Sequence, residues 1–322
     1  MTGPRPLRVV AFGGGHGLAA SLRALRIVAS HRPLEITAVV TVGDDGGSSG
    51  RLRADRGALP PGDLRKALVA LADDDDPATG RTAQLLQHRF AGSDPLAGHA
   101  VGNVVLCGLI ELMGDPVAAL DHARALLRCH GRVLPMSRQL IGIEADVRGG
   151  DPTRPDKVVV VRGQHLVAVN RGTVVTVRLT PAAPVACAEA VEAIEVADWL
   201  IFGPGSWYTS VIPHLLVPDL AAAVVKSQAR RLVTLNLTTD TETVGLSLPG
   251  HLAALHRYLP ALRVDVVIAD HDAIGVPMPV RRAAESLGAR LVLAPVAVAH
   301  GAAHHDPVAL AAAMGPVLGP DA

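Results

Sequence analysis

The stretch RVVAFGGGHGLAASLRAL, at residues 8–25, constrains the fold of this chain more than any other part of the sequence. Residues 7–12 are apolar and rich in valine without polar alternation, which predicts a buried strand. The apolar side chains over 17–29 recur at every third or fourth position and predict a helix. LEITAVVTV, at 34–42, predicts a second strand. A strand, a glycine turn, a helix and a strand in this order begin a parallel α/β sheet.

The rest of the chain continues this alternation, so we expect an α/β fold with a doubly wound, mostly parallel sheet. The sequence predicts a core from residues 1–130 and 181–300, and a C-terminal tail at 301–322. Residues 131–180 contain the β-branched runs VVVV, HLVAV and TVVTVRL between turn signals, which predict a β-rich insertion with strands paired in hairpins. Residues 43–63 are glycine-rich and polar, which is typical of a functional or mobile loop. Further helices are predicted at 63–72, 79–89, 102–113, 116–128, 185–197, 218–228, 249–258 and 279–287, and further strands at 198–203, 231–236, 263–269 and 289–294.

The charged residues balance, with 30 Lys+Arg and 30 Asp+Glu among 322 residues. This balance argues against a nucleic-acid-binding or membrane-surface protein. No apolar run approaches the ~20 residues that a membrane span needs, and we expect no leader sequence, because the apolar run before the first glycines is only VVAF. The three scattered cysteines fit a reducing compartment. We therefore expect a cytoplasmic protein without a nucleic-acid partner, and a homodimer only as the commonest oligomer.

The first glycine turn, GGGHGL, combines Gly13, Gly14, Gly15 and Gly17 with His16. Glycines let the backbone approach a phosphate closely, and the N–H groups at the start of the next helix favour an anion. A leucine stands where the dinucleotide fingerprint needs its third glycine, and no GK[ST] follows. The turn therefore predicts a phosphate or nucleotide site of another kind, with a purely structural turn as the alternative. His16 suits either a ligand contact or an exposed loop position.

The polar segment TVGDDGGSSGRLR follows the second predicted strand. In a right-handed βαβ unit its start lies beside the first glycine turn. Paired carboxylates can hold a divalent cation such as Mg²⁺ or accept hydrogen bonds from a ribose, while backbone amides and hydroxyls can form a phosphate nest. The alternative is a flexible loop. The ligand-binding residues predicted here are Asp44, Asp45, Gly46, Gly47, Ser48 and Ser49.

Three shorter motifs each supply one candidate ligand contact: Arg65, Asn103 and Asn236. In PPGDLRK, Asp63 suits a helix cap, and Arg65 in the first turn opposes the helix dipole, which favours an anionic partner beside it. In GHAVGN, Asn103 can cap a helix or hold a sugar or base edge, and His99 fits a local hydrogen bond or a ligand contact. Asn236, in LNLTTDTET after a later strand, is a further candidate ligand contact.

A second glycine turn lies in FGPGSWYTSVIPHLL, at 202–216, again directly after a predicted strand. Its hydroxyl side chains stand at a helix start, which suits an anion, and its tyrosine ring can stack on a ligand or pack in the core. The candidates are Gly203, Gly205, Ser206, Tyr208 and Thr209. The sequence therefore predicts two glycine turns, far apart in the chain, that lie side by side and converge on one diphosphate.

Neither a catalytic residue nor a metal site is predicted with the spacing that such sites need. GPGSW lacks the pattern of a nucleophile elbow. The cluster HGAAHHDP, at 300–307, resembles a metal-binding patch but has no counterpart ligand pattern elsewhere. HDP before a helical run is typical of a helix cap.

Five motifs in register, GGGHGL, TVGDDGGSSGRLR, PPGDLRK, GHAVGN and GPGSWYTSVIPHLL, resemble those of the gluconeogenesis factor family, the YvcK-like proteins. These are relatives of the CofD-type 2-phospho-L-lactate transferases, and the resemblance covers residues 8 to about 245. It implies a Rossmann-like fold with an inserted β region, and a cytoplasmic protein that binds nucleotide sugars such as UDP-N-acetylglucosamine. It also implies a regulatory role in carbon metabolism, cell-wall precursor supply and cell shape, without an established reaction.

The chain departs from the family pattern at several positions: His16 replaces the usual Thr, Gly43 the usual Ala, Lys66 the usual Asn, and LTTDTET a stretch like MTQPGET. The alternative function is that of a CofD-type enzyme, which moves a phospho-lactate-like group from a guanylated donor onto a deazaflavin, with the Asp pair holding Mg²⁺. Against it, GGSSGRLR follows the GDD motif where a PDLDT-like stretch would be expected. A nicotinamide dehydrogenase fits least, because the glycine spacing is wrong.

Overall fold

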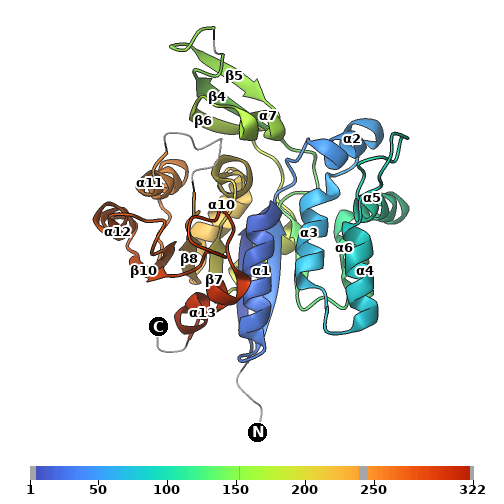
Figure 1. The fold of residues 1–322 in the computed structure, drawn as a ribbon, viewed down its shortest axis with the longest axis horizontal. Helices are drawn as coiled ribbons and strands as arrows, with labels where there is room; N and C mark the ends of the chain where they lie inside the picture. Colours follow the sequence, from blue (N-terminus) through green and yellow to red (C-terminus); the bar gives the residue numbers. More distant parts are fainter. Residues whose placement is uncertain (1–4, 152, 239–245, 320–322) are drawn as a thin grey trace.

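The computed structural model describes residues 5–151, 153–238 and 246–319. Within these residues the chain forms a seven-stranded parallel sheet and a three-stranded antiparallel sheet that stands away from it (Figure 1). This α/β fold with a small inserted sheet is the one that the sequence predicts. The strands of the large sheet are β1 (Leu7–Gly13), β2 (Leu34–Val40), β3 (Arg132–Pro135), β7 (Trp199–Phe202), β8 (Arg230–Thr234), β9 (Val266–Asp270) and β10 (Arg290–Ala294).

The strand order β10-β9-β8-β7-β1-β2-β3 places β1 and β7 side by side, with Phe12 opposite Phe202. From this pair the chain builds outward in opposite directions, toward β3 and toward β10. Right-handed crossovers therefore place α1 (Gly15–Ala29) and α10 (Pro218–Lys226) on opposite faces of the sheet. The carboxyl ends of β1 and β7 form the switch point at which doubly wound sheets bind their ligands.

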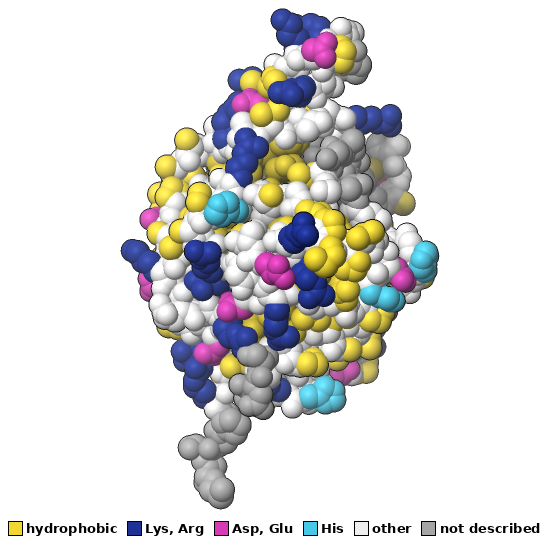
Figure 2. Space-filling model, turned by 90° about the vertical axis from the view of Figure 1, so that its left-hand side faces the viewer, with side chains coloured by type: hydrophobic (Ala, Val, Ile, Leu, Met, Phe, Trp, Pro, Cys, Tyr) yellow, Lys and Arg dark blue, Asp and Glu magenta, His cyan; other side chains and the backbone are white. Residues whose placement is uncertain are grey.

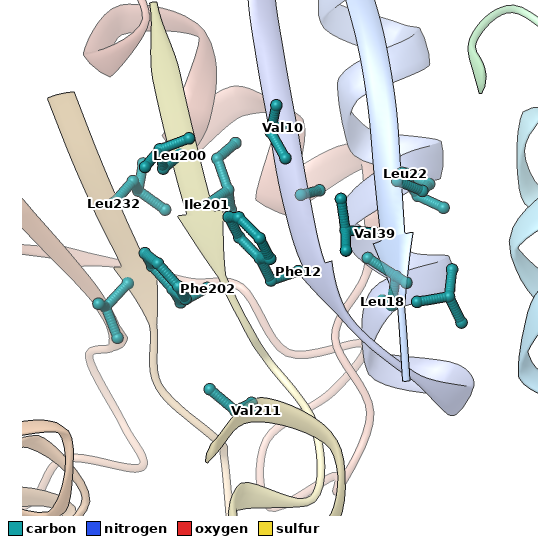
Figure 3. Close-up of a cluster of buried hydrophobic side chains, with 14 of the residues drawn as sticks. Val10, Phe12, Leu18, Leu22, Val39, Leu200, Ile201, Phe202, Val211 and Leu232 are labelled. Carbon is teal, nitrogen blue, oxygen red and sulfur yellow. The ribbon is translucent and has the colours of Figure 1, made fainter. Parts of the chain in front are cut away.

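The core beneath this switch point is built on two stacked rings. Phe12 and Phe202 lie with their centroids 4.8 Å apart and their planes 8° from parallel. Figure 3 shows Leu18 and Leu22 of α1 and Val211 of the second glycine turn in the same cluster of buried side chains. Because helices cover both faces of the sheet, the strands are continuous apolar runs rather than alternating ones. This packing fixes the ends of β1 and β7 relative to each other.

Ten further helical segments connect these strands within the described residues, and α13 (Pro307–Val317) follows the last strand. The connecting segments are α2 (Gly47–Arg56), α3 (Pro61–Leu71), α4 (Pro77–Gln87), α5 (Val101–Met113), α6 (Pro116–Leu126), α8 (Ala188–Glu195), the π-helical turn η1 (Trp207–Val211), α9 (Ile212–Leu215), α11 (Leu248–Tyr258) and α12 (Pro277–Ser286). The expectation of a loop throughout 43–63 was wrong, because α2 lies inside it. Its first turn is glycine and serine, which have low helix propensity, but Ser48 and Ser49 are buried against the core, and Gly57 ends the helix with φ +60°.

The small sheet has the order β5-β4-β6 and is antiparallel throughout. Its elements are β4 (Gly142–Arg148), β5 (Val158–Arg162), the short helix α7 (Gln164–Val169) and β6 (Thr173–Thr180). Of the segment 131–180, the first strand, β3, pairs with β2 in the large sheet. HLVAV was expected in a strand and instead forms α7, because tertiary contacts at its first turn override its β propensity.

No single helix among the described residues is long and apolar enough to cross a membrane. One bent pair, Trp207–Leu215 with Pro218–Lys226, meets the test by length and composition. All side chains of its first half are buried in the core of the fold.

Figure 2 shows the face at the left of Figure 1, where basic and acidic side chains are mixed and do not form separate patches of positive and negative charge.

Candidate functional site

The two glycine turns meet at the carboxyl ends of β1 and β7, around a cavity of about 560 Å³. Gly17 lies so close to the second turn that a Cβ on it would be 2.2 Å from the carbonyl oxygen of Pro204. A Cβ on Gly205 would lie 3.7 Å from the carbonyl oxygen of Gly14. The prediction that the two turns lie side by side is therefore confirmed.

The start of α1 presents backbone donors to this cavity. Gly15 begins the helix with φ +63°, a conformation that residues with a Cβ rarely adopt. No side chain caps this helix, and Gly15, His16 and Gly17 of its first turn all line the cavity. The first N–H groups of a helix have no partner within it, so they are available to an anionic ligand.

The cavity gathers some of the predicted residues and leaves others out. Those that line it are Gly14, Gly15, His16, Gly17, Asp44, Gly205, Ser206 and Asn236. Those that lie outside its wall, all of them described, are Gly13, Asp45, Gly46, Gly47, Ser48, Ser49, Arg65, Asn103, Gly203, Tyr208 and Thr209. The remaining lining residues are Ala20, Arg23, Asp63, Lys66, Gln164, Pro204, Ser210, Leu237, Thr238, Ala303, His304, His305 and Pro307.

Asn236 fixes the second glycine turn through both ends of its carboxamide. Gly205 N donates to Asn236 Oδ1 at 3.0 Å, and Asn236 Nδ2 donates to the carbonyl oxygen of Gly205 at 2.9 Å. The side chain therefore holds one peptide group of the turn in place. Its contribution to a ligand site is to orient the backbone of Gly205, and the remainder of LTTDTET beyond Thr238 lies outside the described residues.

Two carboxylates, Asp44 and Asp63, face the same part of the cavity. A Cβ on Gly14 would lie 2.6 Å from Asp63 Oδ2, so Asp63 stands directly beside the first glycine turn. Lys66 Nζ donates to Asp63 Oδ1 at 3.1 Å. Burial raises the pKa of Asp44, and the charge of Asp63 raises it further. Asp63, at the start of α3, takes the place beside Asp44 that the sequence pattern DD suggested for Asp45.

Asp45 points away from the cavity toward the inserted sheet. Its Oδ1 accepts a hydrogen bond from the backbone N–H of His165 at 2.8 Å. A Cβ on Gly163, which has φ +103°, would lie 2.4 Å from Asp45 Oδ2. The carboxylate therefore fastens the start of α7 to the core, which is the contact that makes HLVAV helical.

The serines of the same motif support helices. Ser48 Oγ lies 3.0 Å from His99 Nδ1 and accepts from Asn103 Nδ2 at 3.0 Å, in a buried network beside α5. Burial lowers the pKa of His99. Ser49 Oγ accepts from the backbone N–H of Gly62 at 3.0 Å, at the start of α3. These side chains support the cavity wall from behind. Asn103 does not cap α5, whose N-cap is Ala100, because its carboxamide bonds to Ser48 instead.

Arg65 is buried at the back of α3, where its guanidinium donates to the carbonyl oxygen of Leu86. Burial lowers the pKa of Arg65 to about 10, with a further contribution from the charge of Arg89. The carbonyl oxygen of Gly203 accepts a hydrogen bond from the buried hydroxyl of Ser21. Tyr208 and Thr209 are buried in the π-helical turn. These residues therefore belong to the support of the site.

One wall of the cavity carries cationic or titratable side chains from both ends of the chain. Arg23 and His16 come from α1, and His304 and His305 come from the segment before α13. Partial desolvation, followed by the charge of Lys66, lowers the pKa of His16. His305 Nε2 lies 3.1 Å from the carbonyl oxygen of Leu235, and burial lowers the pKa of His305 to about 4.

The cluster at 300–307 thus contributes to the cavity wall, while Asp306 caps α13 by accepting from Val308 N and Ala309 N. This cap is the one that its sequence suggests. Among the described residues, one group has the spacing to hold a metal ion, Asp270 with His271 and Asp272. Both carboxylate oxygens of Asp270 already accept hydrogen bonds from backbone N–H groups, so this carboxylate stabilises the loops that follow β9 and β10.

Comparison with known proteins identifies the family of this chain. The family model of 2-phospho-L-lactate transferase CofD matches residues 9–291. This chain belongs to the CofD family. A relative from Mycobacterium tuberculosis strain CDC 1551 / Oshkosh, provisionally named a gluconeogenesis factor, is 47% identical over 317 residues, which are 97% of this chain and 91% of that protein.

Other members of the CofD family carry the same name or share the fold. The gluconeogenesis factor of Bacillus subtilis strain 168 is 35% identical over 291 residues, or 90% of this chain and 86% of that protein. The crystal structure of a UPF0052 family member from Bacillus halodurans superposes with a TM-score of 0.83 at 32% identity, covering 97% of this chain and 99% of that one. The family suggested by the five motifs is therefore confirmed.

Proposed function

We propose that this protein binds a nucleoside-diphosphate sugar, of the UDP-N-acetylglucosamine kind, in the cavity between its two glycine turns. The observation that carries the proposal is the contact of Gly17 with Pro204, which brings two anion-binding turns onto one cavity. Two phosphates joined by one oxygen can take hydrogen bonds from adjacent backbone donors. The uncapped start of α1 supplies such donors, and in the second turn the N–H groups after Gly205 are the candidates, because the N–H of Gly205 itself donates to Asn236. The cavity volume lies within the range of about 300–1,000 Å³ that is typical of ligand sites.

The proposed role is regulatory. Members of the CofD family with 35–47% identity to this chain are named gluconeogenesis factors, which supports a link to carbon metabolism. Binding of a cell-wall precursor sugar would connect that metabolism to precursor supply and cell shape, in the cytoplasm. On the cavity wall Arg23 offers a positive charge to the phosphates of such a ligand, while the charge of Lys66 is paired with Asp63.

A thermal-shift panel tests this proposal directly. UDP-N-acetylglucosamine, NAD, GTP and a deazaflavin are each added with and without Mg²⁺. A ligand at about a hundredfold over its Kd stabilises the folded state by ~2.7 kcal/mol, so a clear upward shift is expected with the UDP-sugar. A shift with the deazaflavin and GTP but none with the UDP-sugar would reverse the proposal.

The second candidate is a CofD-type transferase, favoured by the placement of Asp44 beside Asp63. Carboxylate oxygens are the ligands that Mg²⁺ prefers, and Asp44 and Asp63 are the cavity residues that would hold such an ion. A bound Mg²⁺ would neutralise charge on a transferring phosphoryl group. Incubation with a guanylated 2-phospho-lactate donor, a deazaflavin and Mg²⁺ would then release GMP. Release in the wild type that an Asp63→Asn variant lacks would favour this function over a regulatory one.

A further inference from the structure

Gln164, the first residue of α7, brings a side-chain carboxamide from the inserted sheet to the wall of the cavity. It is half-buried, and no described residue makes a hydrogen bond to its carboxamide. The second carboxamide on the wall, that of Asn236, bonds through both its oxygen and its nitrogen to Gly205. Gln164 therefore offers a donor and an acceptor that the fold itself does not use.

The backbone around Gln164 is held firmly on both sides. Gly163 N donates to the carbonyl oxygen of Ile143 in β4 at 2.8 Å. His165 N donates to Asp45 Oδ1 at 2.8 Å, and Val167 N donates to the carbonyl oxygen of Gly163 at 3.0 Å. A polar group on a backbone fixed in this way is pre-organised to read a ligand.

Two carboxylates of the same wall, Asp44 and Asp63, already accept hydrogen bonds within the fold. Asp44 accepts from Gly46 N at 3.0 Å, and Asp63 accepts from Lys66. A carboxamide is complementary to a group that places a donor and an acceptor next to each other, as an amide or imide does. A nucleotide sugar can present this group twice, in the imide edge of uracil and in an acetamido substituent of the sugar.

We infer that Gln164 is a specificity-determining residue, which reads an amide or imide group of the ligand whose diphosphate lies on the glycine turns. This inference rests on the proposed function and names the part of the ligand that the inserted sheet recognises. The inserted sheet thereby supplies selectivity, and the glycine turns supply attraction for the phosphates. Ligands that lack the group bind through the turns alone.

Calorimetric titration of the wild type, Gln164→Ala and Gln164→Glu tests the inference with two ligand pairs. UDP-N-acetylglucosamine against UDP-glucose isolates the acetamido group. UDP against its N3-methyl derivative isolates the imide. In one of the pairs we expect the wild type to prefer the ligand with the intact group about ten-fold or more, and both variants to lose that preference. Gln84 lies on the exposed side of α4, so Gln84→Ala is the matched control, which removes the same side chain from an exposed position.

The possible results distinguish a failure of the inference about Gln164 from a failure of the proposed nucleotide-sugar site. If the wild type binds the ligands and the variants keep its affinity ratios for both pairs, the role of Gln164 is overturned. The proposed nucleotide-sugar site would then stand. Failure of the wild type to bind any of the four ligands would overturn both. Melting temperatures of the variants within about 2 °C of the wild type exclude misfolding as the cause, since a surface truncation costs little stability.

Discussion

The contact between Gly17 and the second glycine turn makes a sharp prediction for Gly17→Ala. The added Cβ would lie 2.2 Å from the carbonyl oxygen of Pro204, 2.6 Å from its carbonyl carbon and 2.8 Å from Gly205 Cα. Non-bonded atoms prefer separations of about 3.5 Å, so the two turns must move apart by roughly 1 Å. All three neighbours are backbone atoms of a turn that Asn236 holds in place, so they cannot rotate away.

The magnitude follows from two opposing effects. Replacing glycine with alanine inside a helix stabilises a protein by up to about 1 kcal/mol. Forcing an extra carbon into a packed region costs about 1–3 kcal/mol. We expect Gly17→Ala to lower the free energy of unfolding by about 1–2 kcal/mol and the melting temperature by a few degrees. Affinity for UDP-N-acetylglucosamine should fall at least about ten-fold, because the donors no longer converge.

Gly108→Ala is the matched control, because Gly108 lies in α5 and a Cβ there would meet no atom within 4 Å. The same substitution should raise the melting temperature slightly and leave UDP-sugar binding unchanged. Urea unfolding and calorimetric titration of both variants decide the matter. If Gly17→Ala is as stable as Gly108→Ala and binds the UDP-sugar as the wild type does, the two turns are not packed as described and do not form one site.

Three further predictions concern other residues of the cavity and its support. Asn236→Ala removes both hydrogen bonds to Gly205 and should weaken UDP-sugar binding, measured by titration, by up to about thirty-fold, because two bonds of roughly 1 kcal/mol each no longer hold the turn; unchanged affinity would show that the turn keeps its conformation without Asn236. Asp45→Ala releases the N–H of His165, so hydrogen exchange at residues 163–169 should quicken while the main unfolding transition moves little, and unaltered exchange would argue against the carboxylate as the anchor of α7. Burial lowers the pKa of His214 to about 4; since the ordinary value is about 6.5, the unfolded chain takes up the proton first, and the free energy of unfolding should fall as the pH drops from 6.5 toward 4, by roughly 3 kcal/mol at most for this group. A His214→Phe variant whose urea stability falls over that pH range as much as that of the wild type would speak against this assignment.

The positions of the glycine turns could be predicted from the sequence because parallel strands leave few choices. Once residues 7–12 and 198–203 were identified as buried strands of a parallel sheet, their carboxyl ends were expected at the same edge of that sheet. Adjacency of β1 and β7 then followed from the switch in direction of a doubly wound fold. The helical and strand periods were strong in these segments because each element buries an apolar face.

The partners of individual side chains could not be predicted in the same way. The adjacent carboxylates of Asp44 and Asp45 suggested one shared site, yet successive residues point to different sides of the chain, and Asp63 from another helix stands beside Asp44 instead. HLVAV has the composition of a strand, but the contact of its first turn with Asp45 makes it a helix. Gln164 gave no signal, because its place depends on how the inserted sheet docks.

The cavity wall contains residues from α1, near the start of the chain, and residues 303–307, close to its end. During synthesis these two groups leave the ribosome far apart in time. The pocket is therefore completed only after His304 and His305 have emerged and α13 has packed against α1 (Figure 1). A polypeptide that ends before residue 303 therefore lacks this part of the cavity wall.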